Sequence, residues 1–248
     1  MTIKQGDFIR IEYTTTIKET GEFFDTTVEE EAKNEKIFKE NGIYEPMLVV
    51  VGEGWVLKGL DNSLLDLEVG KEAIIEISPE QGFGLRDPAK IRLIPVRRLR
   101  KKKIVPYIGA QVEIDGKLGI VRSVGAGRVQ IDFNPPLAGK TLIYKLTVKE
   151  QIKNRKEKAK ALIHRRIPSV NIEKFKIKIS AKNFTVDFPE DAFYLEGIQF
   201  IKRGILSDQQ KFFPNIEKTM FTETFIKEKI IPQTVEALQG QENDSKDT

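Results

Sequence analysis

Residues 56–77, VLKGLDNSLLDLEVGKEAIIEI, pass from a short amphipathic helix through a turn into a strand. Apolar side chains recur at helical spacing in the first half of this stretch, at Val56, Leu57, Leu60, Leu64, Leu65 and Leu67. Residues 68–71 have the composition of a turn, and residues 72–78 read as a strand that Pro79 ends. This segment therefore predicts a domain that mixes one short helix with β-strands.

Strands are predicted on both sides of this segment. Residues 7–17 (DFIRIEYTTTI) are rich in β-branched side chains and alternate apolar with polar positions, which favours a strand. The turn-like residues 18–21 and the stretch 22–27 complete a hairpin. Residues 47–52 indicate a short buried strand, and residues 141–148 (TLIYKLTV) alternate again. We expect this last strand to rejoin the first sheet.

The sequence changes character at Asp87 and Pro88. Between residues 91 and 133 it consists of short β-like pieces separated by glycines, which resembles a small barrel of its own. Because residues 141–148 return to the first sheet, this barrel is predicted to be an insertion. After it, residues 150–166 favour a linker helix that Pro168 stops.

A chain of 248 residues and 28.3 kDa has room for one large domain or two to three small ones. The predicted division has a discontinuous first domain, an inserted domain, a linker helix, a C-terminal α+β domain and a disordered tail. Their bounds are 1–87 with 137–152, 88–136, 153–169, 170–235 and 236–248. The core of the C-terminal domain is expected to contain five phenylalanines, Phe175, Phe184, Phe188, Phe193 and Phe200.

Composition excludes several classes of chemistry. With no cysteine, disulfides, thiolate nucleophiles and zinc-thiolate sites cannot form. The single histidine, His164, cannot make a two-histidine metal site and is expected to be a surface or linker residue. The longest apolar run, residues 47–51, is far shorter than the roughly 18 residues of a membrane span. The N-terminal residues show no secretory signal, so a cytoplasmic location without membrane association is expected.

Four pieces of the sequence together resemble a known family. They are IEYTTTIKETGEFFDTT, residues 56–77, QGFGLRDP and, much later, LAGKTLIYKLTV. In this order they resemble the FKBP-type peptidyl-prolyl cis-trans isomerases, closest to the SlyD and long archaeal branch. The resemblance implies an antiparallel half-barrel wrapped on a short helix, with a chaperone domain inserted in its flap. It also implies cis/trans isomerisation of X-Pro bonds without cofactor or metal.

The resemblance assigns roles to individual residues by position. It places Asp25 beside the twisting bond, the Leu57 N–H on the substrate carbonyl, and Leu60 at the pocket floor where relatives often carry a larger aromatic ring. Phe83 would cover the site, although many relatives have Tyr there, so one hydrogen-bond donor is lost. The walls of the proline pocket would be Tyr13, Phe24, Val56, Leu57 and Tyr144.

Each of these residues has a simpler interpretation when taken alone. Tyr13, Phe24 and Tyr144 lie on alternating strands and could be ordinary core residues. Asp25 could cap a turn, and apolar residues at helical spacing usually serve packing. The order and spacing of the whole set favour a site.

For the insert, the resemblance implies a surface that binds unfolded or proline-containing client proteins. The candidates for this surface are Ile104, Val105, Tyr107 and Ile108. The alternative is that these four side chains fill the core of the small barrel. By the same resemblance, the C-terminal domain mediates homodimer formation or offers a second client surface.

A different function class stays open at this point. The insert also looks like an SH3-like barrel of translation proteins, and the basic residues 97–103 (RRLRKKK) precede its strands. A formal charge of +4 and a pI near 9.0 weakly favour acidic partners. RNA or ribosome binding is therefore the alternative function, although aromatic side chains for base stacking are scarce in the insert. A compromise is that the basic linker helix docks the isomerase near the ribosome.

Overall fold

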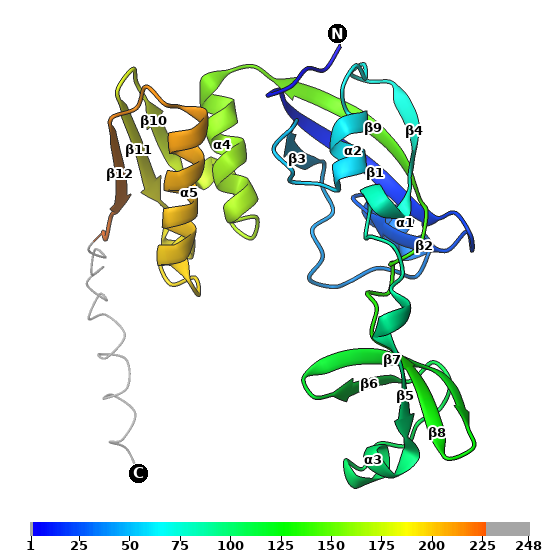
Figure 1. Ribbon diagram of the computed structural model, residues 1–248. Helices are drawn as coiled ribbons and strands as arrows, with labels where there is room; N and C mark the ends of the chain where they lie inside the picture. The colour runs from blue at the N-terminus through cyan, green and yellow to red at the C-terminus, as the bar shows by residue number, and fades with distance from the viewer. Residues whose placement is uncertain (1, 227–248) are drawn as a thin grey trace, which may run out of the picture. The chain divides into compact units, whose positions relative to one another are not determined.

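The computed structural model describes residues 2–226, and the predicted tail lies outside them. The described chain has a mixed α+β fold with three sheets, two of which are wholly antiparallel (Figure 1). This confirms the predicted fold class at that level. The described residues form two compact units, which divide between residues 165 and 166. Among the described residues, none of the helices combines the length and the apolar character needed to cross a bilayer.

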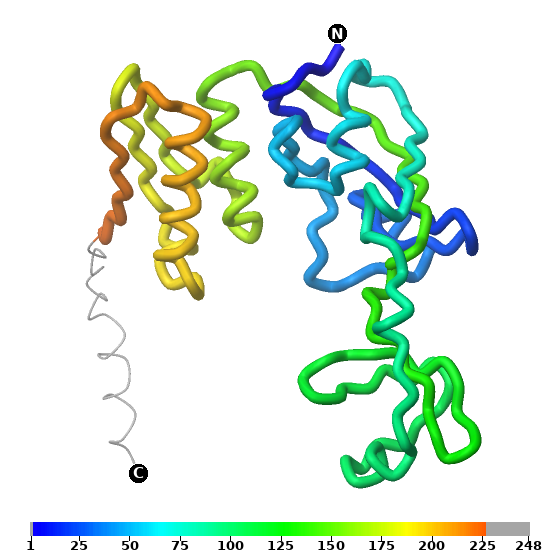
Figure 2. Tube along the Cα trace, viewed as in Figure 1, coloured from blue at the N-terminus to red at the C-terminus, as the bar shows by residue number. Residues whose placement is uncertain are grey.

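The first sheet is antiparallel and joins segments that are far apart in the sequence. Its order is β2-β1-β9-β4, with β3 paired to β1. The longest pairing aligns Phe8 with Ile152 at one end and Ile17 with Leu142 at the other. Figure 2 shows the blue β1 beside the yellow-green β9. The strands are β1 (Phe8–Ile17), β2 (Phe23–Thr26), β3 (Met47–Val50), β4 (Glu72–Ile77) and β9 (Leu142–Ile152).

The short helix α2 (Lys58–Ser63) packs on this sheet and is half as long as predicted. Leu57 is still extended at its N-terminal end, and Asp66 has a left-handed φ of 64°, so the helix cannot continue through residue 67. Leu60 and Leu64 are nonetheless buried in the same core as the sheet residues. A β-carbon on Gly59 would lie 2.8 Å from Ile77 Cγ2, so only glycine permits this close approach of α2 to β4.

The insert forms its own four-stranded sheet with the order β5-β8-β7-β6. Its core contains Ile94, Leu99, Val121 and Ile131. The basic residues 97–101 belong to a helix, α3, that follows β5 directly. The elements are β5 (Ile91–Pro95), α3 (Val96–Lys101), β6 (Gln111–Ile114), β7 (Lys117–Gly125) and β8 (Arg128–Asp132).

Side-chain bonds hold together the two chain segments that lead into and out of the insert. The Asp87 N–H donates to Asn134 Oδ1 at 2.9 Å, and Asn134 Nδ2 donates to the Asp87 carbonyl at 2.9 Å. The buried Asp132 carboxylate accepts from the Asn134 side chain and forms ion pairs with Arg86 and Arg122. These bonds fix the base of the insert, whose strands pair with no strand of the first sheet among the described residues.

The helix α4 (Arg155–Arg166) begins five residues later than predicted, because residues 150–152 continue β9. His164 lies on α4, the predicted linker helix, but it is not a surface residue. The His164 side chain is only 16% exposed, and its Nε2 lies 2.6 Å from Glu45 Oε1. A histidine that is followed by two arginines gives no sequence sign of this partner, which is 119 positions away.

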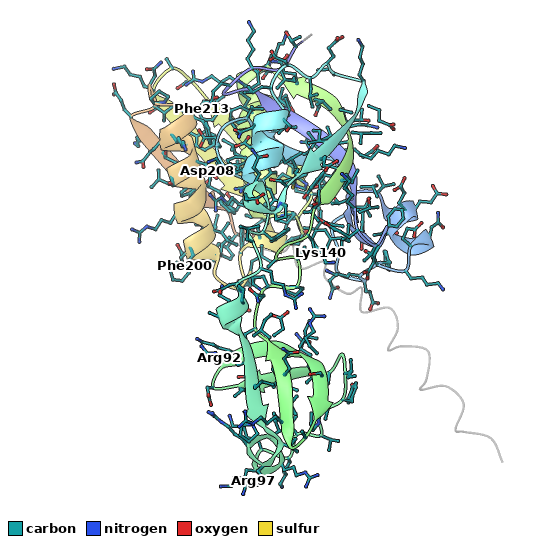
Figure 3. All side chains as sticks on the ribbon, turned by 45° about the vertical axis from the view of Figure 1, so that its right-hand side comes forward. Arg92, Arg97, Lys140, Phe200, Asp208 and Phe213 are labelled. Atoms are coloured by element: carbon teal, nitrogen blue, oxygen red, sulfur yellow. The ribbon has the colours of Figure 1, made fainter. Side chains whose placement is uncertain are left out.

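The second unit contains a three-stranded sheet in the order β10-β11-β12, in which β11 and β12 are parallel. Four of the five predicted core phenylalanines are buried, whereas Phe200 is 81% exposed near the start of α5, which corrects that prediction (Figure 3). Asp208 on α5 accepts two hydrogen bonds from Arg166, each of 2.8 Å. The elements are β10 (Lys176–Ile179), β11 (Asn183–Phe188), α5 (Ile198–Phe212) and β12 (Lys218–Glu223).

Candidate active site

The hairpin of β1 and β2 places a phenol against a carboxylate. Residues Thr15 and Asp25 are paired across the two strands, next to a register shift. The Tyr13 hydroxyl donates to Asp25 Oδ2 at 2.8 Å, and the Thr26 N–H donates to Asp25 Oδ1 at 3.0 Å. Both oxygens of the partly buried carboxylate are therefore held in place.

Aromatic rings surround this pair. The rings of Tyr13 and Tyr144 lie 5.4 Å apart between centroids and are tilted by 52°. Phe24 contacts Phe83 edge to face at 6.1 Å. Tyr144 is buried, whereas Phe83 is 38% exposed. The arrangement gives an apolar wall with one ring at its solvent side.

The residues at the start of α2 complete the group. Val56 and Leu57 are partly buried and pack against the core that contains Leu60 and Tyr144. Leu60 is 1% exposed, so it lies beneath the other side chains. Leu57 immediately precedes α2, and within residues 2–226 its backbone N–H donates to no other group. A free N–H donor thus lies beside apolar side chains.

The structure therefore brings together all eight residues singled out in the sequence. Six belong to one apolar cluster, Asp25 is bonded to one of these six, and Phe83 contacts another. Beside Asp25 and Phe24, a cavity of about 480 Å³ opens toward the loop of residues 36–44. Phe38 and Tyr44 of this loop stack at 5.3 Å and line the cavity.

Burial sets the ionisation of the two phenols. It raises the pKa of Tyr13 far above its ordinary value of 10.0, and the charge of the hydrogen-bonded Asp25 raises it further. Burial also raises the pKa of Tyr144 to about 12. Tyr13 consequently stays protonated at neutral pH and remains a hydrogen-bond donor to Asp25.

Sequence reasoning missed one residue that shapes the site, Asp61. Its buried carboxylate accepts from the Gly52 N–H at 2.8 Å and from the Gly54 N–H at 2.9 Å. Both glycines have positive φ, so the carboxylate closes the turn that leads to Val56 and Leu57. The available signal was an acid on the apolar face of the short helix, four residues after Leu57.

The four insert candidates fall into two groups. Val105, Tyr107 and Ile108 are 82%, 68% and 70% exposed, so they do not fill the barrel core. Ile104 is partly buried and packs against that core, as the alternative interpretation had it.

Three family models match this chain. The family model described as FKBP-type peptidyl-prolyl cis-trans isomerase matches residues 1–100. The models "FKBP26, IF domain" and "FKBP26_C-terminal" match residues 92–137 and 155–226.

Several curated relatives have matching names. A short-type peptidyl-prolyl cis-trans isomerase of Methanocaldococcus jannaschii is 34% identical over 148 residues, 60% of this chain and 93% of the relative. An FKBP-type 16 kDa peptidyl-prolyl cis-trans isomerase of Escherichia coli is 31% identical over 117 residues, 45% of this chain and 76% of that protein. SlyD of Helicobacter pylori is 24% identical over 107 residues, 42% and 58% of the two chains.

The fold, the residues at the short helix and these relatives define one class of protein. The chain belongs to the FKBP-type peptidyl-prolyl cis-trans isomerases, and carries the inserted and C-terminal segments of the FKBP26 type. Its substrates are proline-containing proteins. The predicted enzyme class is thereby confirmed, and nothing in these matches supports the RNA-binding alternative.

The raised pKa of Tyr144 predicts a specific loss of stability in alkali. Between pH 10 and 12 the folded protein keeps this proton and the unfolded chain releases it, so the free energy of unfolding falls as pH rises. The contribution of Tyr144 to this fall is about 2–3 kcal/mol by pH 12. Urea unfolding across this pH range should show a shallower fall for Tyr144→Phe.

The matched control for this experiment is Tyr107→Phe, which removes an exposed phenol of the insert. The free energy of unfolding of this variant should fall with pH as steeply as that of the unchanged protein. Equal slopes for the two variants would contradict the assignment.

Asp61 is predicted to position the loop that carries Leu57. Asp61→Ala removes the acceptor of two backbone N–H groups and should lower the free energy of unfolding by about 1–3 kcal/mol. The same variant should lower kcat/KM on a proline tetrapeptide, while Asp61→Asn restores part of both. Asn62→Ala, at an exposed position of the same helix, is the control. A fully active Asp61→Ala enzyme would show that the loop keeps its shape without the carboxylate.

Proposed function

We propose that the prolyl ring of the substrate binds against Tyr13, Phe24, Val56, Leu57 and Tyr144, above Leu60, and that Phe83 covers it. The observation that carries this proposal is the placement of a fixed carboxylate and a free backbone N–H at one apolar surface. Support comes from the Tyr13–Asp25 bond of 2.8 Å and from the unused Leu57 N–H within the described chain.

The chemistry required of such a pocket is modest. Rotation about an X-Pro bond meets a barrier near 20 kcal/mol that arises from partial double-bond character, and no bond is made or broken. An apolar surface that removes water from the amide disfavours its charge-separated resonance form, which lowers the barrier. In this proposal the Leu57 N–H binds the carbonyl of a flanking residue and so orients the twisting bond.

Asp25 has a second part in this proposal. As the prolyl bond twists, the proline nitrogen loses conjugation with the carbonyl and the charge distribution of the amide changes. A carboxylate held by Tyr13 and by the Thr26 N–H keeps its position during this change. No free energy is therefore needed to reorganise it. Phe83 cannot donate the hydrogen bond of a tyrosine at its position, so turnover depends more strongly on burial.

The first test changes the carboxylate. Asp25→Asn keeps the shape and removes the charge, and kcat/KM on a proline tetrapeptide in a protease-free assay should fall about tenfold or more. Tyr13→Phe, which frees Asp25 from its hydrogen bond, should cause a smaller loss. Glu22→Gln on the same hairpin is exposed and serves as control. Unchanged turnover in both site variants would remove Asp25 and Tyr13 from the site.

We infer further that the insert, residues 88–136, is a separate client-binding domain with chaperone activity. Its sheet pairs with no strand of the first sheet in the described chain, and one family model covers nearly the same residues. Val105, Tyr107 and Ile108 offer exposed apolar contacts for unfolded chains. The first domain then consists of residues 1–87 and 137–152.

The insert hypothesis is tested by excision. The Phe133 N–H donates to the Lys90 carbonyl at 3.0 Å, so the ends of the insert are adjacent and a short loop can join them. Replacing residues 91–133 in this way should abolish suppression of client aggregation and retain activity on a tetrapeptide. If the shortened enzyme suppresses aggregation equally well, the client surface lies elsewhere.

For the C-terminal part we propose a homodimer contact or a second client surface. Tyr194 and Phe200 support this because both are more than four-fifths exposed within the second unit. The matching family model begins at residue 155, so it includes all but the first two residues of the helix expected as a linker, residues 153–169, together with the described part of residues 170–235. Docking at the ribosome stays a prediction.

A further inference from the structure

The insert has a charge opposite to that of the rest of the chain. Residues 88–136 contain eleven Lys and Arg but three Asp and Glu, a net charge of +8. The whole chain carries only +4, so the remaining residues sum to −4. The basic character of the protein is therefore concentrated in the domain that offers the exposed apolar side chains.

Carboxylates neutralise only part of this charge. Asp132 is paired with Arg122, and Asp115 forms ion pairs with Arg98 and Lys102. A different set, Arg97, Arg100 and Arg128, has no carboxylate partner within residues 2–226. All three side chains are exposed.

These three arginines surround one groove. A cavity of about 700 Å³ lies between α3 and the β7–β8 turn, and its lining includes all three arginines and no acidic residue. The rest of the lining is largely aliphatic and includes Val96, Ile104 and Val105. Figure 3 shows Arg97 at the α3 end of the insert. Apolar side chains and unneutralised cations thus share one concave surface.

The lining favours a polypeptide over a nucleic acid. Binding of single-stranded RNA depends on aromatic side chains that stack on bases, and none of the residues lining this groove is aromatic. Aliphatic side chains suit the apolar side chains of an unfolded protein, while guanidinium groups pair with carboxylates. The charge complementarity therefore points to acidic, apolar peptide segments.

We propose that this groove selects acidic client segments, in which Asp or Glu flank apolar residues. The proposal rests on the client-binding function of the insert and specifies its substrate class. Arg97, Arg100 and Arg128 bind the carboxylates, and the aliphatic lining takes up the neighbouring apolar side chains. Because the charges are exposed, the preference weakens as salt screens them. The isomerase pocket needs no such selectivity.

The test compares two fluorescent peptides bound to the full chain. They share the same apolar residues and differ only in carrying Glu or Lys at the remaining positions. At low salt the Glu peptide should bind at least about tenfold more tightly than the Lys peptide. This difference in affinity should shrink at high salt. Reversing Arg97, Arg100 and Arg128 to Glu should abolish the preference. Reversing Lys90, Arg92 and Lys117 to Glu makes the same change in net charge outside this groove and should largely preserve it.

The outcomes separate charge selection from client binding itself. Equal affinity for the two peptides, with aggregation still suppressed, overturns the selectivity and leaves the chaperone function standing. Equal loss in the two triple variants also overturns it, because net charge alone then explains binding. Failure of either peptide to bind, together with unsuppressed aggregation, overturns both proposals. Displacement of the Glu peptide by a uridine-rich RNA strand at lower concentration than by unlabelled Glu peptide favours a nucleic-acid partner instead.

Discussion

The pairing of β1 with β9 is the constraint on which the first unit depends. It joins Phe8 to Ile152 and Ile17 to Leu142, so everything between these strands is a closed loop of the chain. The entropy of closing a loop grows only slowly with its length, so a domain can be inserted without a large loss of stability. The same pairing brings Tyr144 against Tyr13, which places an aromatic wall in the sheet. The strand pairing that closes the sheet therefore also forms part of the candidate site.

In the proposed mechanism, catalysis depends on the positions of the groups and on the exclusion of water. The eight candidate residues offer one charge and one free backbone donor on an apolar surface, and none of them forms a covalent bond to the substrate in this proposal. Hydrogen bonds to neighbouring groups hold them in position. Asp61 fixes the loop before Leu57, and Tyr13 fixes Asp25. A buried carboxylate with two donors is a stiff support, because losing either bond leaves a polar group unsatisfied.

In our proposals, the insert separates client binding from isomerisation. Its base is held by Asp87, Asn134 and Asp132, while its groove and exposed apolar residues lie elsewhere on its surface. The first domain needs an apolar pocket that accepts any prolyl ring. The groove of the insert can instead select client segments by their charge. The first domain then catalyses isomerisation, and the insert selects the client proteins that reach it.

The sequence by itself determined the family and the mixed α+β class, and it predicted the candidate site residues, because an ordered set of short motifs can be recognised without coordinates. It also placed the strands, since alternation and β-branching are local signals. Tertiary structure decided what depends on distant partners. The end of α2 at Ser63, the partner of His164, the exposure of Phe200 and the role of Asp61 follow from packing and from backbone groups that no local pattern reports. Charge was countable in the sequence, but only the fold showed that three arginines lacking carboxylate partners share one groove.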